Sequence, residues 1–179
     1  MTRYIALLRG INVGGKNMID MKQLKAAFAE AGFCDVRTYI NSGNVLFSSS
    51  MESARVLAAS KKLISEQFKL DIPVVILTSE ELSDLLDHAP EWWGREPDTR
   101  HNAMFVIAPA TAEDICAEVG EIKAQYEKCA YYGRLIFWSA PIKTFSRTRW
   151  GKVSSLAAYQ KITVRNSNTA YKLLELSKE

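Results

Sequence analysis

The stretch DVRTYINSGNVLFSS, residues 35–49, predicts a β-hairpin. The segments 35–40 and 44–49 are rich in β-branched and aromatic side chains, which fit a pleated, half-buried surface. The Asn-Ser-Gly between them supplies residues that tolerate the positive φ angles of a tight turn. Because strands joined by so short a turn run antiparallel, we expect this part of the chain to form an antiparallel sheet.

The residues on either side extend this hairpin to a unit of six elements. Asp20, with Gln23 three residues later, is typical of a helix N-terminus, and Gly32 is typical of a helix end. Hydrophobic periodicity predicts the four flanking elements: a strand at 3–9, a helix at 20–32, a helix at 52–70 and a strand at 73–78. The order β-α-β-β-α-β is that of the ferredoxin-like unit.

The second half of the chain repeats this order. A helix at 78–90, capped by Thr78, leads to the segment EWWGREPDTRHN, residues 91–102, which we interpret as a connector. The elements expected after it are a strand at 103–108, a helix at 111–125, hairpin strands at 127–132 and 134–140, a helix at 146–160, a strand at 161–165 and a helix at 168–179. The sequence therefore predicts an α+β fold of two tandem ferredoxin-like (βαββαβ) halves with antiparallel sheets, residues 1–90 and 103–179.

The loop LLRGINVGGKN, residues 7–17, matches the start of a triphosphate-binding loop, Gly-x-x-x-x-Gly-Lys from Gly10. Such a loop also needs a hydroxyl after the lysine and a helix that begins at the Gly-Lys pair. Here Asn17 stands in place of the hydroxyl, and the helix begins only at Asp20. We therefore interpret the match as fortuitous.

The same loop still predicts a site for an anion. Its glycines let backbone N–H groups approach a ligand, and the turn at 41–44 belongs on the same edge of the predicted sheet. The ligand-binding residues predicted here are Arg9, Gly10, Asn12, Gly14, Gly15, Lys16, Asn17, Asn41, Ser42 and Asn44. No general base is expected beside them, because Asp20 is occupied as a helix cap. The alternative is that the glycines are needed only for the backbone angles of a turn and that the loop binds no ligand.

Charge distribution points to a second anion-binding region. The chain has a net charge of +3, and no acidic residue occurs between Glu127 and Glu175. That interval holds nine lysines and arginines with Trp138, Phe145 and Trp150 interleaved, a composition that favours an anionic partner. The predicted binding residues in this half are Arg147, Arg149, Lys152, Arg165, Asn166 and Asn168. The alternative is a merely solvated basic surface.

Metal, cofactor and membrane functions find no support in the sequence. The three cysteines are scattered, and neither they nor His88 and His101 have metal-ligand spacing. We expect buried thiols in a cytoplasmic protein that holds no metal and no cofactor. No apolar run approaches the ~20 residues of a membrane span. The first residues, MTRYIALLRGIN, have too short an apolar core for a signal peptide.

Three strings of the sequence resemble a known family. YIALLRGINVGGKNMIDMKQLKAAF, VRTYINSGNVLF and ITVRNSNTAYKLLEL are similar to the domain of unknown function 1697 family, a widespread group of uncharacterised bacterial proteins. The resemblance implies a cytoplasmic α+β protein of two ferredoxin-like halves, with no settled activity. The family pattern Arg-Asn-Trp-Asn-Thr is altered here, because Ser167 stands in place of the tryptophan, so a stacking role at that position is not expected.

Three hypotheses follow for the function. The first is a binding module for an anionic ligand, either nucleic acid or a phosphorylated small molecule. The second is an enzyme acting on a phosphorylated or nucleotide substrate, with Lys16 or an arginine as electrophile and the base supplied by substrate or water. The third is a protein–protein adaptor that uses the adjacent Trp92 and Trp93.

Overall fold

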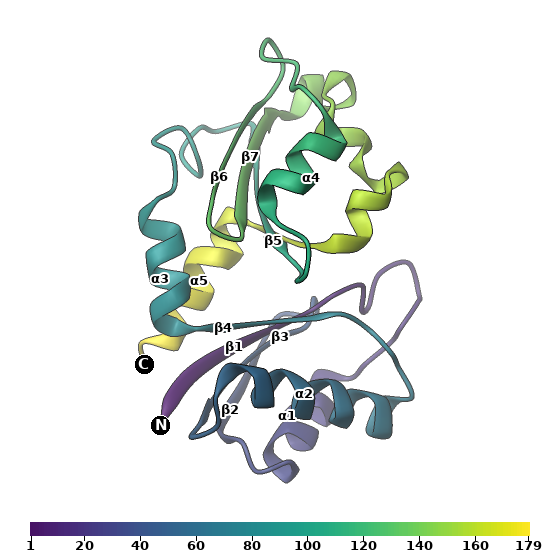
Figure 1. Cartoon of the computed structure of the whole chain (residues 1–179), viewed down its shortest axis with the longest axis vertical. Coiled ribbons are helices and arrows are strands. Elements are labelled where there is room, and N and C mark those ends of the chain that lie inside the picture. Colours follow the sequence, from purple (N-terminus) through teal and green to yellow (C-terminus); the bar gives the residue numbers. More distant parts are fainter. The chain divides into compact units, whose positions relative to one another are not determined.

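The computed structural model describes residues 1–179 and divides into two compact units (Figure 1). Unit 1 comprises Met1–Ser83 together with Lys172–Glu179, and unit 2 comprises Asp84–Tyr171. The boundary passes through two helices, α3 (Ser79–Asp87) and α5 (Ser167–Ser177). The fold is α+β, with one four-stranded antiparallel sheet in each unit.

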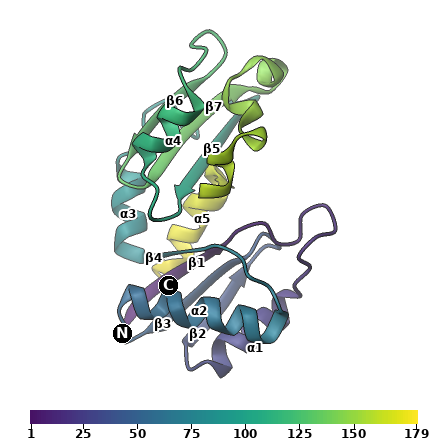
Figure 2. The same ribbon diagram turned by 45° about the vertical axis from the view of Figure 1, so that its right-hand side comes forward.

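Unit 1 is a sheet with two helices on one face, as Figures 1 and 2 show. Its elements are β1 (Thr2–Leu8), α1 (Met21–Glu30), β2 (Cys34–Tyr39), β3 (Asn44–Ser49), α2 (Ser53–Phe68) and β4 (Val74–Thr78). The strand order is β2-β3-β1-β4, and every neighbouring pair is antiparallel. The predicted hairpin is confirmed, with Tyr39 opposite Asn44 at its turn.

Alternation along β1 builds the core of unit 1. Tyr4, Ala6 and Leu8 face α1 and α2, as expected for a strand whose side chains point to alternate faces. Phe28 of α1 and Phe47 of β3 pack against each other there, with ring centroids 5.3 Å apart. Burial of each such side chain contributes roughly 1.5–3 kcal/mol to stability. The helices are therefore held to the sheet by aromatic and aliphatic packing.

Side-chain caps begin the helices at the predicted residues. The Asp20 carboxylate accepts hydrogen bonds from the backbone N–H groups of Lys22 and Gln23, at 2.9 and 3.0 Å. Thr78 Oγ1 accepts from Glu81 N, and Thr111 Oγ1 accepts from Asp114 N. Each cap satisfies N–H groups that have no partner inside the helix.

Unit 2 has the same strand order with a different covering layer. Its elements are β5 (Thr99–Val106), α4 (Ala112–Val119), β6 (Lys128–Tyr132), β7 (Leu135–Pro141), the 3-10 helices η1 (Ile142–Arg147), η2 (Trp150–Ser155) and η3 (Ala157–Lys161), and β8 (Ile162–Asn166). The order β6-β7-β5-β8 is antiparallel throughout. The predicted hairpin around Gly133 is confirmed. β5 begins at Thr99 rather than at residue 103, because His101 and its polar neighbours pair with β7.

The predicted helix at 146–160 is wrong, since three short 3-10 helices cover residues 142–161. The backbone N–H groups of Arg149 and Trp150 donate to the carboxylate of Glu127 instead of to carbonyls one helical turn earlier. Gly151 N donates to Thr148 Oγ1 at 2.9 Å. Further along, the N–H groups of Lys152 and Leu156 donate to carbonyls three residues earlier, the pattern of 3-10 helices and not of an α-helix.

Two further helix limits differ from prediction. The helix expected at 111–125 ends at Val119, because Gly120 adopts φ +89° and stops it. The last helix begins at Ser167, one residue before the prediction, and Asn166 Oδ1 accepts from Thr169 N at 2.7 Å as its cap. No helix of the structure combines the length and the apolar character needed to cross a membrane.

We predict that Gly43→Ala lowers the free energy of unfolding. Gly43 has φ +82°, and a Cβ there would lie 2.8 Å from both Leu8 Cβ and Ile11 Cδ1. A side chain at positive φ costs about 1–2 kcal/mol, and overpacking adds about 1–3 kcal/mol, so we expect a loss of about 2–4 kcal/mol. Urea unfolding followed by circular dichroism measures it.

Gly32→Ala is the matched control. Gly32 has φ +90°, but nothing lies within 4 Å of the position of a Cβ. Only the backbone cost of about 1–2 kcal/mol is expected there. Equal losses in the two variants would contradict the steric argument at Gly43.

Candidate functional site

The glycine-rich loop of unit 1 closes as a tight turn. Val13 and Lys16 form an isolated antiparallel bridge, and Lys16 N donates to Val13 O at 3.0 Å. Gly14 and Gly15 between them have φ +57° and +73°. Two consecutive positive φ angles are those of a type I′ turn, which glycine adopts without steric cost. The geometry of the turn by itself explains why both residues are glycine.

The side chains of two asparagines in this loop form hydrogen bonds with nearby backbone groups. Asn12 Nδ2 donates to Ile19 O and to Asn41 O, at 3.0 and 2.9 Å, while Asn12 Oδ1 accepts from Ile19 N. Asn17 Nδ2 donates to Gly10 O at 3.0 Å. The loop and the turn at 40–43 therefore meet, as the sequence predicted. The amide groups that were predicted to bind a ligand instead bind the protein's own backbone.

The other predicted residues of this loop differ in accessibility. Asn44 is fully buried and donates from Nδ2 to Tyr39 O and to Ser42 Oγ, both at 3.0 Å. Arg9 is half-buried. Lys16 is exposed and has no carboxylate partner. The loop thus offers a ligand one fully exposed cation and a few exposed backbone groups.

The basic interval between Glu127 and Glu175 is partly neutralised by acids that lie outside it in the sequence. At least three of its nine cations form ion pairs: Lys128 with Glu96 at 3.3 Å, Lys161 with Glu118 at 3.1 Å, and Lys172 with Glu175 at 2.7 Å. Lys172 belongs to unit 1, so eight of the nine cations lie in unit 2. The interval therefore carries less uncompensated positive charge in the folded protein than its sequence alone indicates.

Arg165 is part of the packed interior of unit 2. Only 6% of it is exposed, and Nη1 donates to Thr163 Oγ1 and to Val164 O. Burial lowers the pKa of its guanidinium to about 10, so the group stays charged at neutral pH. Asn166 caps α5, and Asn168 is exposed on its first turn. Of these three predicted residues, only Asn168 presents a side chain that is not committed to the fold.

Four of the other cations are exposed on η1, on η2 and between them, and we call them the η1–η2 cation cluster: Lys143, Arg147, Arg149 and Lys152. All four are exposed, and none has a carboxylate within ion-pair distance. The Arg147 guanidinium lies over the ring of Tyr126, 5.6 Å from its centroid. Arg100 lies over Phe145, on η1, at 4.2 Å. Cations and aromatic rings are thus interleaved in space as well as in sequence.

A buried carboxylate sets the path of the segment that carries this cluster. Glu127 is 3% exposed, and its Oε1 accepts from Lys123 N and Arg149 N at 2.9 and 2.7 Å. Its Oε2 accepts from Trp138 Nε1 and Trp150 N at 2.9 and 3.1 Å. Four N–H donors compensate the cost of burying the charge. Sequence analysis used Glu127 only as the limit of the acid-free interval and missed this role.

An aromatic cavity of about 230 Å³ lies beneath the 3-10 segment. Its walls include the rings of Trp138, Phe145, Trp150 and Tyr159, with Asn102 and Ser154 among the polar residues. Because Phe145 and Trp150 belong to η1 and η2, the cavity borders the cation cluster. Flat apolar walls beside positive charge suit a ligand that joins an aromatic ring to a phosphate.

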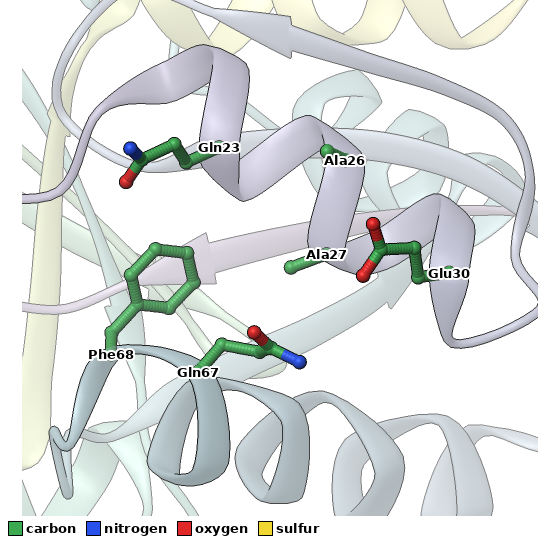
Figure 3. A pocket seen from close by; sticks show the side chains of 6 residues that line it. All are labelled: Gln23, Ala26, Ala27, Glu30, Gln67 and Phe68. Carbon is green, nitrogen blue, oxygen red and sulfur yellow. The ribbon is translucent and has the colours of Figure 1, made fainter.

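A cavity of about 220 Å³ in unit 1 has the opposite character. Figure 3 shows it between α1 and α2, with Gln23 and Glu30 on one side and Gln67 and Phe68 on the other. It is lined by amides and a carboxylate and by no cation. This cavity does not suit an anion.

The adjacent tryptophans of the predicted connector are not both presented to solvent. Trp93 is 1% exposed, donates from Nε1 to Asn102 O at 3.0 Å, and packs edge-on against Phe137. Trp92 is half-buried. Trp93 therefore anchors residues 91–98 to unit 2, and the adaptor hypothesis stays a prediction that rests on Trp92.

Comparison with known proteins connects the chain to proteins of unknown function. The family model described as "Protein of unknown function (DUF1697)" matches residues 1–137. The solved structure of the conserved bacterial protein SP0830 from Streptococcus pneumoniae is similar over 100% of this chain and 99% of that one, with 30% identity and a TM-score of 0.90. No curated protein matches the chain. The cation cluster lies beyond the residues that match the family model.

We predict that Glu127→Gln destabilises the protein. The amide nitrogen of glutamine would face two backbone or indole N–H donors that now share one carboxylate oxygen. Leaving buried donors unsatisfied costs about 1–3 kcal/mol each, so we expect a loss of about 2–4 kcal/mol in guanidinium unfolding.

Glu118→Gln is the control for the loss of a charge in the same unit. Glu118 is largely solvated and pairs with exposed Lys161, so its loss is expected to cost about 1 kcal/mol or less. A Glu127→Gln variant as stable as Glu118→Gln would show that Glu127 does not organise this region.

Proposed function

The chain belongs to the DUF1697 family, and we propose that it is a binding module for a nucleotide-type phosphate, whose contact surface is the η1–η2 cation cluster with the aromatic cavity beside it. The ligand chemistry is a phosphate ester attached to an aromatic base. A free nucleotide and a single-stranded nucleic acid both supply it. The observation that carries the proposal is the set of four exposed cations without carboxylate partners.

Electrostatics supports a polyanionic ligand. Lys143, Arg147, Arg149 and Lys152 follow one another within ten residues and stay unneutralised, whereas Lys128 and Lys161 of the same unit are paired. Phosphate contacts by lysine and arginine release counterions, which makes such binding favourable at low salt. Two of the four are arginines, which bind phosphate oxygens in a bidentate manner.

The cavity supports the aromatic part of the ligand. Successive bases of single strands stack on aromatic side chains, and each stacked base contributes about 1–3 kcal/mol. Trp138 and Trp150 are buried, so the rings at which a base would stack are the two partly exposed ones, Phe145 and Tyr159, and Arg100 lies over Phe145. A volume of about 230 Å³ admits a single base rather than a large ligand.

Binding fits the site better than catalysis. The carboxylate bonded to the backbone of the cluster, Glu127, accepts four hydrogen bonds and has no capacity left to take a proton from a substrate. Both ring nitrogens of His101 are engaged, Nδ1 with Ser139 Oγ and Nε2 with Glu96 O. The enzyme hypothesis would require a general base from elsewhere.

We also infer that both units derive from the ferredoxin-like arrangement. Each sheet places its first strand between its third and fourth, with its second at the edge, and all pairs are antiparallel. Unit 2 departs from the arrangement in one respect, because η1, η2 and η3 stand where the second helix is expected.

We predict that Arg147→Gln/Lys152→Gln weakens binding to a short fluorescent oligothymidine at least about tenfold at low salt. The dependence of log Kd on log salt should also fall by roughly one unit of slope for each lost phosphate contact. Fluorescence anisotropy at several salt concentrations measures both. Competition with adenosine monophosphate, and with inorganic phosphate, distinguishes a nucleotide site from a nucleic-acid site.

Two further variants make the test selective. Lys22→Gln/Lys25→Gln removes the same charge from α1 and should leave affinity within about twofold, apart from a general electrostatic effect. Lys16→Gln tests whether the N-terminal loop contributes to binding. If wild-type protein binds neither the oligonucleotide nor the nucleotide, or if the α1 variant weakens binding as much as the η1–η2 variant, the proposal fails.

A further inference from the structure

Two cysteines from different elements line one cavity of unit 2. Cys116 lies on α4 and Cys129 on β6, and a cavity of about 280 Å³ has both among its walls, together with Tyr131 and Trp150. Both cysteines are free and half-buried, whereas the third, Cys34, is exposed. This differs from the expectation of scattered buried thiols.

The two thiols interact directly. A hydrogen bond from the Cys129 thiol lowers the pKa of Cys116, because it stabilises the thiolate. The same hydrogen bond, burial and the charges of Cys116 and Glu127 raise the pKa of Cys129. Of the two thiols, Cys116 therefore loses its proton more easily than Cys129, which makes Cys116 the nucleophile.

We propose that Cys116 and Cys129 form an oxidisable dithiol that small hydroperoxides convert into an intramolecular disulfide. The Cys116 thiolate attacks one peroxide oxygen, the O–O bond breaks, and Cys116 becomes a sulfenic acid while the other oxygen leaves as water after taking a proton. Cys129 then attacks the sulfenic sulfur, and the S–O bond breaks with release of a second water. Two thiols and one hydrogen peroxide thus give one disulfide and two water molecules.

The surroundings of the pair suit this chemistry. The cavity gives a small oxidant access to both sulfur atoms, which a packed interior would deny. Sulfur atoms already in hydrogen-bond contact need only a short approach to the S–S distance of about 2 Å. The bond would join α4 to β6, two elements that pack against the same core. Cys34 is exposed, so its own reaction with peroxide is excluded from the test by replacing it.

The experiment uses full-length protein with Cys34→Ser, which leaves only the pair. After treatment with a slight excess of hydrogen peroxide, mass spectrometry should show the loss of two hydrogen atoms, reversed by dithiothreitol, with the protein still monomeric on a non-reducing gel. Adding Cys129→Ser should let a sulfenic acid accumulate at Cys116, where dimedone traps it. Adding Cys116→Ser instead should slow oxidation of Cys129 at least about tenfold relative to Cys116.

A second probe does not depend on the paired-cysteine variants. Phenylarsine oxide condenses with two neighbouring thiols and releases one water, so Cys34→Ser protein should bind it in a one-to-one ratio. The proposal is overturned if peroxide yields only sulfinic acids or intermolecular dimers, if Cys116 and Cys129 react at equal rates, or if the arsenical does not bind. These outcomes leave the nucleotide proposal unaffected, because the anisotropy assay is run on reduced protein.

Discussion

The carboxylate of Glu127 is the acceptor on which the architecture of unit 2 depends. It joins the turn before β6, the indole of Trp138 on β7 and the backbone at the start of η2 through four hydrogen bonds. A buried carboxylate without partners would cost several kcal/mol, so the burial of Glu127 requires these four donors. The bonds to Arg149 and Trp150 fix the backbone at the start of η2. The side chains of the cation cluster are exposed on η1, on η2 and between them.

Local patterns allowed most of the fold to be predicted from the sequence. The hairpin at 35–49, the caps at Asp20, Thr78 and Thr111, and the apolar run of β1 all depend on neighbours in the chain. The segment 146–160 was mispredicted because a residue about twenty positions earlier accepts its N–H groups. A single glutamate before a strand carries no pattern from which that contact can be inferred.

The candidate site could be predicted only in outline, for the same reason. The sequence shows that Lys128 and Lys161 lie in an interval without acids, but Glu96 and Glu118 reach them across the fold. The donors of Asn12 and Asn17 were expected to face a ligand, and they bind backbone carbonyls instead. A side-chain amide forms hydrogen bonds with backbone groups as readily as with a ligand, so residue type alone could not decide which of them Asn12 and Asn17 bind.

The two sheets share a strand order, and what differs is the connection between the third and fourth strands. In unit 1 this connection is α2, a regular helix whose buried side chains fill the space over the sheet. In unit 2 it is three 3-10 helices, which are tighter and leave their side chains without a single continuous apolar face. That layer packs incompletely, and the two cavities of unit 2 described above have Trp150 of η2 among their walls. In unit 2 the exposed cations therefore stand on 3-10 turns beside an aromatic cavity, whereas the cavity beside α2 in unit 1 is lined by amides and a carboxylate.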